Sequence, residues 1–339
     1  MKLALRIAIL IIVALGLAYA IQKSVQEWGE QQQAGRQAVA EIDQQLKTVV
    51  DPTRRASLQK DRNRLAEQIP QLSNLRFSFL VLGGCCYGLG LIPGGLHLRA
   101  SLQVMGCRAP GLLCVKAQLL GHLGKYVPGK AMVVILRARE LSKAGVPIAA
   151  GTTAVFMETL MMIAVGATVA GLTLLALPLP KWLAIACVCG GLLVSTLTFP
   201  APLRLLLSKL EKHGKTGAMP SPTYRYSGWT WIWQVAAWIG FGVSFTLIAA
   251  SLPGLPPDLP PMTLLAASVA SITLAMVAGF VSLLPGGAGV RELVLAFVLA
   301  PVIGQSSALA AAILARFVFL TVELILGGVI HVWGRRNLG

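Results

Sequence analysis

Long apolar runs alternate with short polar segments along most of the chain. The runs cover residues 3–21, 75–95, 146–178, 182–200, 229–252 and 307–333. A helix needs about 20 apolar residues to cross the hydrocarbon core of a membrane, and each run has about that length or more. The pattern therefore predicts an all-α polytopic membrane protein with about six full spans.

Two further apolar segments are interrupted in the middle. Residues 112–140 break at 126–129, and residues 262–304 break at 284–289. Lipid offers no hydrogen-bond partner to the backbone groups that such a break frees, so the break must lie in protein or line a cavity. We interpret both segments as helical hairpins that re-enter the membrane. Their breaks contain Pro128 and Gly129 in the first, and Pro285, Gly286, Gly287 and Gly289 in the second.

We expect the two hairpins to enter from opposite faces. Basic residues flank the first break, which places its ends on the cytoplasmic side. The second follows a proline-rich segment, 253–261, that we place outside. Opposed broken helices in matching positions of two halves, here 75–200 and 229–335, indicate an inverted-repeat transporter with its site at the midplane.

Three parts follow along the chain. Residues 1–21 are expected to form a membrane anchor, with a cleaved signal peptide as the alternative because Ala18-Tyr19-Ala20 resembles a cleavage site. Residues 22–74 are polar, carry leucines at sevenfold spacing and break at Asp51-Pro52, which predicts an external helical hairpin. This hairpin is interpreted equally well as a solvated spacer or as a surface for a protein partner. Residues 75–335 form the transmembrane domain.

Composition and charge narrow the class of protein. Hydrophobic residues make up 55% of the chain and charged residues 12%, about half the charged fraction of a soluble domain. Soluble enzymes are therefore excluded, and the net charge of +16 is not gathered on a soluble face that would bind nucleic acid. The basic loop 204–225 and the end at Arg335-Arg336 instead predict a cell-membrane protein with both termini in the cytoplasm.

The first break carries the best candidates for contact with a phosphate group. Lys125, Lys130 and Arg137 lie at or near it, where exposed backbone N–H groups and the start of a half-helix favour an anion. The alternative is that these cations only fix the topology of the chain, which is the interpretation we favour for Arg139 and Lys143.

Five ionisable residues lie within or beside the apolar segments: Glu158, Arg291, Glu292, Arg316 and Glu323. Such a group is disfavoured at the centre of a membrane by about 2.5–3.5 kcal/mol on insertion scales, so it faces a cavity or a partner. Internal ion pairs and a headgroup-binding site are both consistent with these residues. Glu292 also lies where a half-helix begins, and a carboxylate there stabilises the helix N-terminus.

Motifs of catalysis are absent from the sequence. We find no nucleophile elbow, Walker loop, catalytic triad or metal-ligand cluster, so no enzyme activity, cofactor or metal is predicted. Any transport is therefore downhill, or coupled to protons or to the membrane potential. His122 is a candidate proton carrier, although a packing role is the more frequent one for a lone histidine.

The two breaks carry a family resemblance. GHLGKYVPGK at 121–130 and LPGGAGVRE at 284–292 resemble the membrane region of lysylphosphatidylglycerol synthases and their stand-alone flippase-like relatives. The resemblance covers about residues 75–335. It implies the lipid-translocating part of these proteins, without the soluble aminoacyl-transferase domain and its lysyl transfer.

These observations predict a lipid translocase. It would bind an anionic membrane lipid, either a phospholipid or a polyprenyl phosphate, between the two hairpins. The alternatives are a membrane-embedded lipid-modifying enzyme and an accessory subunit or scaffold of an envelope lipid pathway.

Overall fold

The computed structural model describes residues 32–69, 74–126, 131–211, 222–282 and 289–336, with single positions at 22, 26, 29, 30 and 287. The described elements are helical: residues 32–48, and α2 (Pro52–Gln68), α3 (Phe77–Gly90), α4 (Ile92–Val104), α5 (Gly111–Leu123), the 3₁₀ helix η2 (Gly124–Tyr126), α6 (Ala131–Ser142), α7 (Ile148–Leu174), α8 (Lys181–Thr196), α9 (Pro200–Glu211), α10 (Tyr224–Ala250), α11 (Pro261–Val281), α12 (Val290–Ile303) and α13 (Gln305–Arg336). The all-α membrane architecture is thus confirmed.

The described residues contain five helical stretches long and apolar enough to cross a membrane. They are Phe77–Val104, Ile148–Leu174, Tyr224–Ala250, Pro261–Val281 and Gln305–Ile330. The expected span at 182–200 is α8, whose 16 residues give about 24 Å at 1.5 Å per residue, short of a full crossing. Conversely, α11 has 21 residues and is long enough to cross, although the sequence assigned it to half a hairpin.

Helices α3 and α4 form one long stretch that continues past the predicted end at residue 95. His97, which the predicted boundary left outside the span, is fully buried, and one of its ring nitrogens lies 3.1 Å from the amide of Gln234. Pro93 does not stop the helix because it occupies the first turn of α4, where no backbone hydrogen bond is lost.

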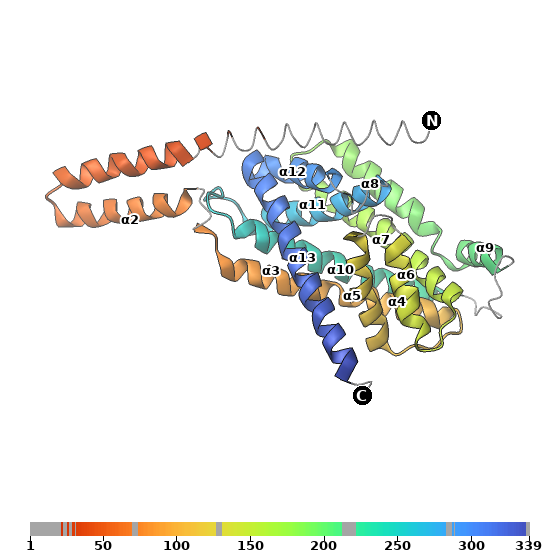
Figure 1. Cartoon of the computed structure of the whole chain (residues 1–339). Coiled ribbons are helices and arrows are strands. Elements are labelled where there is room, and N and C mark those ends of the chain that lie inside the picture. Colours follow the sequence, from red (N-terminus) through yellow and green to blue (C-terminus); the bar gives the residue numbers. More distant parts are fainter. Residues whose placement is uncertain are drawn as a thin grey trace.

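An arm of two antiparallel helices projects from the bundle (Figure 1). Arg62 of α2 donates to Asp43 at 2.8 Å, and Ile69 packs against Gly35, so residues pair in an antiparallel register. The amide of Asn74 donates to the carbonyls of Ala66 and Ile69, which joins the end of α2 to the start of α3. That the arm lies outside the membrane remains a prediction, as does the anchor at 1–21, which lies outside the described residues.

Hydrogen bonds define two ends of the helix bundle. At the arm end, the backbone N–H of Arg76 donates to the carbonyl of Ser251 at 3.0 Å, so the start of α3 meets the end of α10. At the opposite end, Ser101 lies 2.9 Å from the Tyr226 hydroxyl and Ser227 donates to the Thr198 carbonyl at 2.9 Å. We call this second end the basic end, because Arg99, Arg108, Arg139, Lys143 and Arg204 lie on segments that meet there.

Two helix pairs approach the middle of the bundle from different ends. Helices α5 and α6 begin and finish at the basic end, between the end of α4 and the start of α7. Helices α11 and α12 begin and finish at the arm end, between α10 and α13. Helix α13 runs parallel to α3, since Val322 packs near Gly84 and Leu326 near Gly88, and it therefore starts at the arm end.

Small residues let the central helices pack closely. A Cβ at Gly166 of α7 would lie 2.7 Å from the Trp238 ring of α10, and the Trp238 indole donates to the carbonyl of Met162. Large apolar side chains such as Trp182 and Leu193 are exposed on the outside of the bundle. This pattern, with small residues inside and large apolar ones outside, is typical of helices packed in lipid.

Candidate functional site

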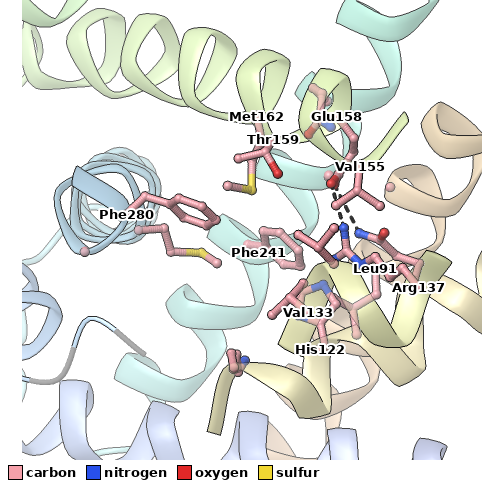
Figure 2. A pocket seen from close by; sticks show the side chains of 18 of the residues that line it. Leu91, His122, Val133, Arg137, Val155, Glu158, Thr159, Met162, Phe241 and Phe280 are labelled. Carbon is pink, nitrogen blue, oxygen red and sulfur yellow. Dashed lines mark hydrogen bonds and ion pairs between the residues drawn. The ribbon is translucent and has the colours of Figure 1, made fainter. Parts of the chain in front are cut away.

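One cavity lies where the two helix pairs meet. It has a volume of about 320 Å³ and receives residues from both pairs, including Lys125 beside the first break and Gly287 in the second. Figure 2 shows Leu91, Val155, Met162, Phe241 and Phe280 around the space. The polar members of its wall are Gln118, His122, Lys125, Arg137, Glu158, Thr159, Gln234 and Arg291. The wall is thus apolar apart from one group of polar and charged side chains.

The cavity reaches the outer surface of the bundle at α7. Phe156 lines the cavity and is nevertheless 60% exposed. Its neighbour in the wall, Thr159, lies one turn along the same helix and is partly exposed. A side opening in this position would connect the cavity with the lipid that surrounds an apolar helix.

Helix α5 presents a polar stripe to the cavity. Gln118, His122 and Lys125 follow one another at spacings of four and three residues, which places them on one face of the helix. The helix ends at Leu123, and η2 carries the chain to Tyr126. Lys125 therefore stands at the last turn before the break.

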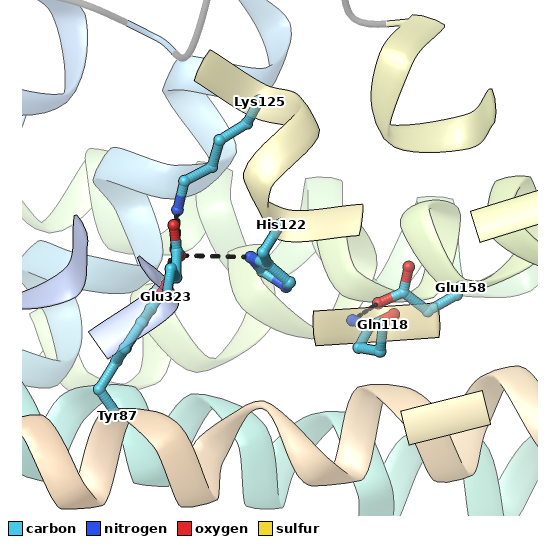
Figure 3. A network of polar contacts seen from close by, with 6 residues as sticks. All are labelled: Tyr87, Gln118, His122, Lys125, Glu158 and Glu323. Carbon is cyan, nitrogen blue, oxygen red and sulfur yellow. Dashed lines mark hydrogen bonds and ion pairs between the residues drawn. The ribbon is translucent and has the colours of Figure 1, made fainter. Parts of the chain in front are cut away.

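Arg137 of α6 and Glu158 of α7 form a buried ion pair on the cavity wall. Nη1 of Arg137 donates to the carboxylate at 2.8 Å, and the two side chains are 6% and 5% exposed. Gln118 donates to the other carboxylate oxygen at 3.2 Å (Figure 3). A Cβ at Gly121 would lie 2.4 Å from Nε of Arg137, so this glycine leaves the space that the arginine occupies.

The second helix pair repeats this arrangement of glycine and arginine. Arg291 of α12 packs against Gly279 of α11, where a Cβ would lie 2.6 Å from its Nε, and against Gly287 at 2.8 Å. Gly287 and Gly289 have φ values of +67° and +79°, which only glycine adopts without strain. The backbone conformation at these two positions therefore favours glycine, whereas Pro285 and Gly286 lie outside the described residues.

Glu292 caps α12 and joins it to α13. Its carboxylate accepts the backbone N–H of Gly289 at 2.7 Å, which confirms that it stabilises the start of this half-helix. The same carboxylate pairs with Arg316 of α13. The pairs Arg137–Glu158 and Arg316–Glu292 are thus alike in position, because each links the second helix of a pair to the long helix that follows it.

Glu323 of α13 forms the centre of a third polar cluster (Figure 3). Its Oε1 pairs with the ammonium of Lys125 and accepts the hydroxyl of Tyr87. The Nδ1 atom of His122 lies 3.6 Å from the same oxygen. This cluster joins the break of the first helix pair to α3 and to the last helix of the chain.

The charges around the two breaks do not balance. In the described part of the chain, Lys125, Arg137, Arg291 and Arg316 face Glu158, Glu292 and Glu323, which leaves one positive charge in excess. Within the same residues, Oε1 of Gln118 and Nε of Arg137 are buried without a hydrogen-bond partner. A ligand with one negative charge and polar atoms would satisfy both features.

The structure gathers most of the predicted site residues at this place. Lys125, Arg137, Glu158 and Arg291 line the cavity. Glu292 and Arg316 line a smaller adjoining cavity of about 50 Å³ together with Lys125 and Arg291, and Glu323 pairs with Lys125. Arg316 and Glu323, which share a helix face, have different partners. Lys130, Pro128 and Gly129 lie outside the described residues.

Two exposed cations that we assigned to topology stand apart from the cavity. Arg139 is exposed. The side chain of Lys143 is 62% exposed and pairs with Glu140, three residues earlier in the chain. Lys116 also pairs with Glu140, at 2.8 Å. These contacts lie toward the basic end, so Lys143 supplies a control for the cations of the cavity.

Sequence reasoning missed three polar residues of the site. Tyr87 lies within an apolar run of α3 and donates a hydrogen bond to Glu323. Gln118 of α5 and Gln234 of α10 line the cavity. The spacing of Gln118 with His122 and Lys125 on one helix face was the available signal. No comparable signal existed for Tyr87 and Gln234, because their partners are more than 100 residues away in the chain.

Comparison with known families identifies a related group. Residues 61–327 match the family described as the lysylphosphatidylglycerol synthase TM region. The matched range contains every residue of the cavity wall and begins within α2, earlier than the resemblance seen from residue 75 onward. A comparison with individually curated proteins found no match.

Proposed function

Because the chain belongs to the lysylphosphatidylglycerol synthase transmembrane-region family, we propose that it moves an anionic lipid across the membrane by holding the headgroup in the cavity between its two interrupted helix pairs. Family and architecture together fit a lipid-related function in the membrane. The observation that carries the proposal is the cavity whose largely apolar wall receives Lys125 and Arg137 from the first pair and Arg291 from the second.

The proposal assigns the three cations to the phosphate. Lys125 supplies a point charge at the end of η2, while the planar guanidinium groups of Arg137 and Arg291 each offer two donors. Lys130 lies close enough in sequence to take part. Glu158 and Glu323 hold Arg137 and Lys125 in place, and Glu292 pairs with Arg316, so the three carboxylates keep the net charge low while no lipid is bound.

The lipid tails would remain in the membrane. The headgroup carries most of the barrier to crossing, because burying its charge and polar atoms in hydrocarbon without partners costs several kcal/mol. A cavity open to the side at Phe156 lets the headgroup move through protein while the acyl chains stay in lipid.

We further propose the membrane arrangement that this transport requires. The pairs α5–α6 and α11–α12 act as re-entrant hairpins, related as an inverted repeat that comprises α3 to α7 and α10 to α13. The basic end faces the cytoplasm of the cell membrane, in keeping with the positive-inside rule. Such repeats place the substrate site between the halves and expose it to one side at a time.

Lipid movement in proteoliposomes tests the proposal. Purified protein is reconstituted with a fluorescent phosphatidylglycerol or, in parallel, a fluorescent phosphatidylcholine, and dithionite bleaching from outside reports how fast the label crosses. We expect the protein to accelerate crossing of the anionic lipid more than that of the zwitterionic one. Equal rates with and without protein would refute the proposal, and a change in headgroup mass of the extracted lipid would favour the enzyme alternative.

Two variants separate the site from general folding. Arg137→Gln combined with Glu158→Gln removes both charges of the buried pair, so no uncompensated charge is left behind. We expect this double variant to reduce crossing at least about tenfold, because one charge-assisted contact is worth about 1.5–3 kcal/mol and about 1.4 kcal/mol corresponds to a factor of ten. Lys143→Ala is the control, and equal losses in both would mean that the cations only set topology.

A further inference from the structure

Lys125 both lines the cavity in which we place the headgroup and, through its ammonium, forms an ion pair with Glu323. Both roles depend on the single positive charge of one flexible side chain. A phosphate that takes Lys125 therefore competes with Glu323 for it.

Glu323 is poorly suited to remain charged after losing Lys125. Its side chain is 1% exposed, and its second oxygen, Oε2, is buried without a hydrogen-bond partner among the described residues. Its ion-pair partner in that part of the chain is Lys125, and the nearby His122 forms an ion pair with it only when the imidazole is protonated. A buried carboxylate left without its cation is strongly destabilised and gains a proton instead.

The other charged and titratable groups nearby do not replace Lys125. They are Tyr87 on α3, His122 on α5, Arg137 on α6, Arg291 and Glu292 on α12, and Arg316 on α13. Arg137 and Arg316 already pair with Glu158 and Glu292, and Arg291 faces the same cavity as the phosphate. Tyr87 donates a hydrogen bond but carries no positive charge.

We propose that Glu323 is a proton-binding site coupled to the headgroup: the lipid anion takes Lys125, and Glu323 binds one proton in exchange. This inference rests on the proposed function and adds a proton as a second transported species. The proton is taken up from the buffered aqueous solution, which loses it, and it forms an O–H bond at Glu323 while Lys125 keeps its own charge. The proton leaves again when the lipid leaves and Lys125 returns.

His122 gives the proton a short route. It lines the cavity, and its Nδ1 atom lies 3.6 Å from the Glu323 carboxylate. An imidazole can accept a proton on one nitrogen and release one from the other. The side chain is 14% exposed, so it connects the cavity with a carboxylate that is otherwise closed off.

The exchange makes transport of a monoanionic lipid electroneutral, since one negative charge and one proton move together. Coupling of this kind is reciprocal: the proton strengthens lipid binding by the factor by which the lipid strengthens proton binding. A pH difference across the membrane would then drive the lipid, whereas a voltage alone would not.

Proton uptake on lipid binding tests the inference. The full-length protein in detergent is titrated with dioctanoyl phosphatidylglycerol by calorimetry, in two buffers of equal pH and different ionisation enthalpy. The difference in heat gives the number of protons bound. We expect about one proton per lipid for the wild type, the limit for a single coupled group. Lipid affinity should also weaken by up to about tenfold per pH unit as the pH rises through the range in which lipid binding takes up this proton.

The variants identify the carboxylate. Glu323→Gln should bind the lipid without proton uptake, because the amide mimics the protonated acid, and Asp258→Asn in the exposed outer loop should behave as the wild type. If the wild type binds the lipid without proton uptake, the proton inference is overturned while the proposed function stands. This result is obtained on the wild type, so it does not depend on whether a variant folds. An unchanged uptake in a folded Glu323→Gln also overturns the proton inference, whereas absence of any lipid binding overturns the proposed function as well.

Discussion

Replacing Gly121 by alanine would test whether the glycine exists to make room for an arginine. The new Cβ would lie 2.4 Å from Nε and 2.5 Å from Cγ of Arg137. Carbon atoms in contact are about 3.5–4.0 Å apart, so the arginine must move by roughly 1 Å. Both atoms belong to the middle of the side chain, so rotation of its tip alone would not relieve the overlap.

The displacement would break the buried ion pair. The Arg137–Glu158 hydrogen bond of 2.8 Å would lengthen beyond the usual limit of about 3.2 Å. Loss of a hydrogen bond to a charged group destabilises by about 1.5–3 kcal/mol, and the better helix propensity of alanine returns about 1 kcal/mol. We therefore expect a net loss of about 0.5–2 kcal/mol in the free energy of unfolding and clearly slower lipid crossing.

Gly190 offers a matched control. It lies inside a helix, as Gly121 does, and a Cβ there would meet nothing within 4 Å. Gly190→Ala should be neutral or slightly stabilising in chemical unfolding in micelles and should leave lipid crossing unchanged. In a Glu158→Gln background, Gly121→Ala should cost less, because the pair is already broken. If both alanine variants match the wild type, the glycine does not serve to seat the arginine.

Three further outcomes follow from the same geometry. Gly279→Ala should resemble Gly121→Ala in the crossing assay, since its Cβ would lie 2.6 Å from Nε of Arg291; wild-type crossing would contradict the likeness of the two helix pairs. Glu292→Gln should lower the unfolding free energy by about 1 kcal/mol through the weakened N-cap, and no change in chemical unfolding would contradict the capping role. In a cysteine-free background, an impermeant maleimide should label Gln45→Cys in intact cells but not Ser208→Cys, and the reverse pattern would invert our orientation.

The interrupted helices could be predicted from the sequence because their signals are local. Prolines and glycines inside apolar segments mark a break wherever the chain folds, and the described ends of α5, α11 and α12 fall within a few residues of the predicted breaks. The role of Glu292 at the start of α12 was likewise local, since its partner Gly289 is three residues away.

The pairing of the charges could not be predicted in this way. Glu323 and Lys125 are separated by 198 positions in the chain, and Arg137 and Glu158 by 21. The sequence identified these groups as buried and in need of partners, but periodicity carries no information about which distant helix supplies the partner. The sequence placed the glycine- and proline-containing break of the second segment at 284–289, which leaves a full span of apolar residues before it, and α11 is accordingly long enough to cross a membrane.

The ion pairs of Glu323 connect different parts of the bundle from those that the other two pairs connect. Arg137–Glu158 lies within the first half of the bundle, and Arg316–Glu292 lies within the second. Of the ion pairs at the cavity among the described residues, those of Glu323 with Lys125 and His122 join α5 and η2 of one proposed half to α13 of the other. A movement of the halves that exposes the cavity first to one side and then to the other must strain this link, while the other two pairs travel with their own half. In the proposed transport cycle, headgroup binding at Lys125 would open this link, and protonation of Glu323 would keep the opened state free of a buried charge. Substrate and proton would therefore release the same contact, the one that holds the two proposed halves together. A ligand can couple lipid transport to the change in the side that the cavity faces only if it favours one conformation in this way.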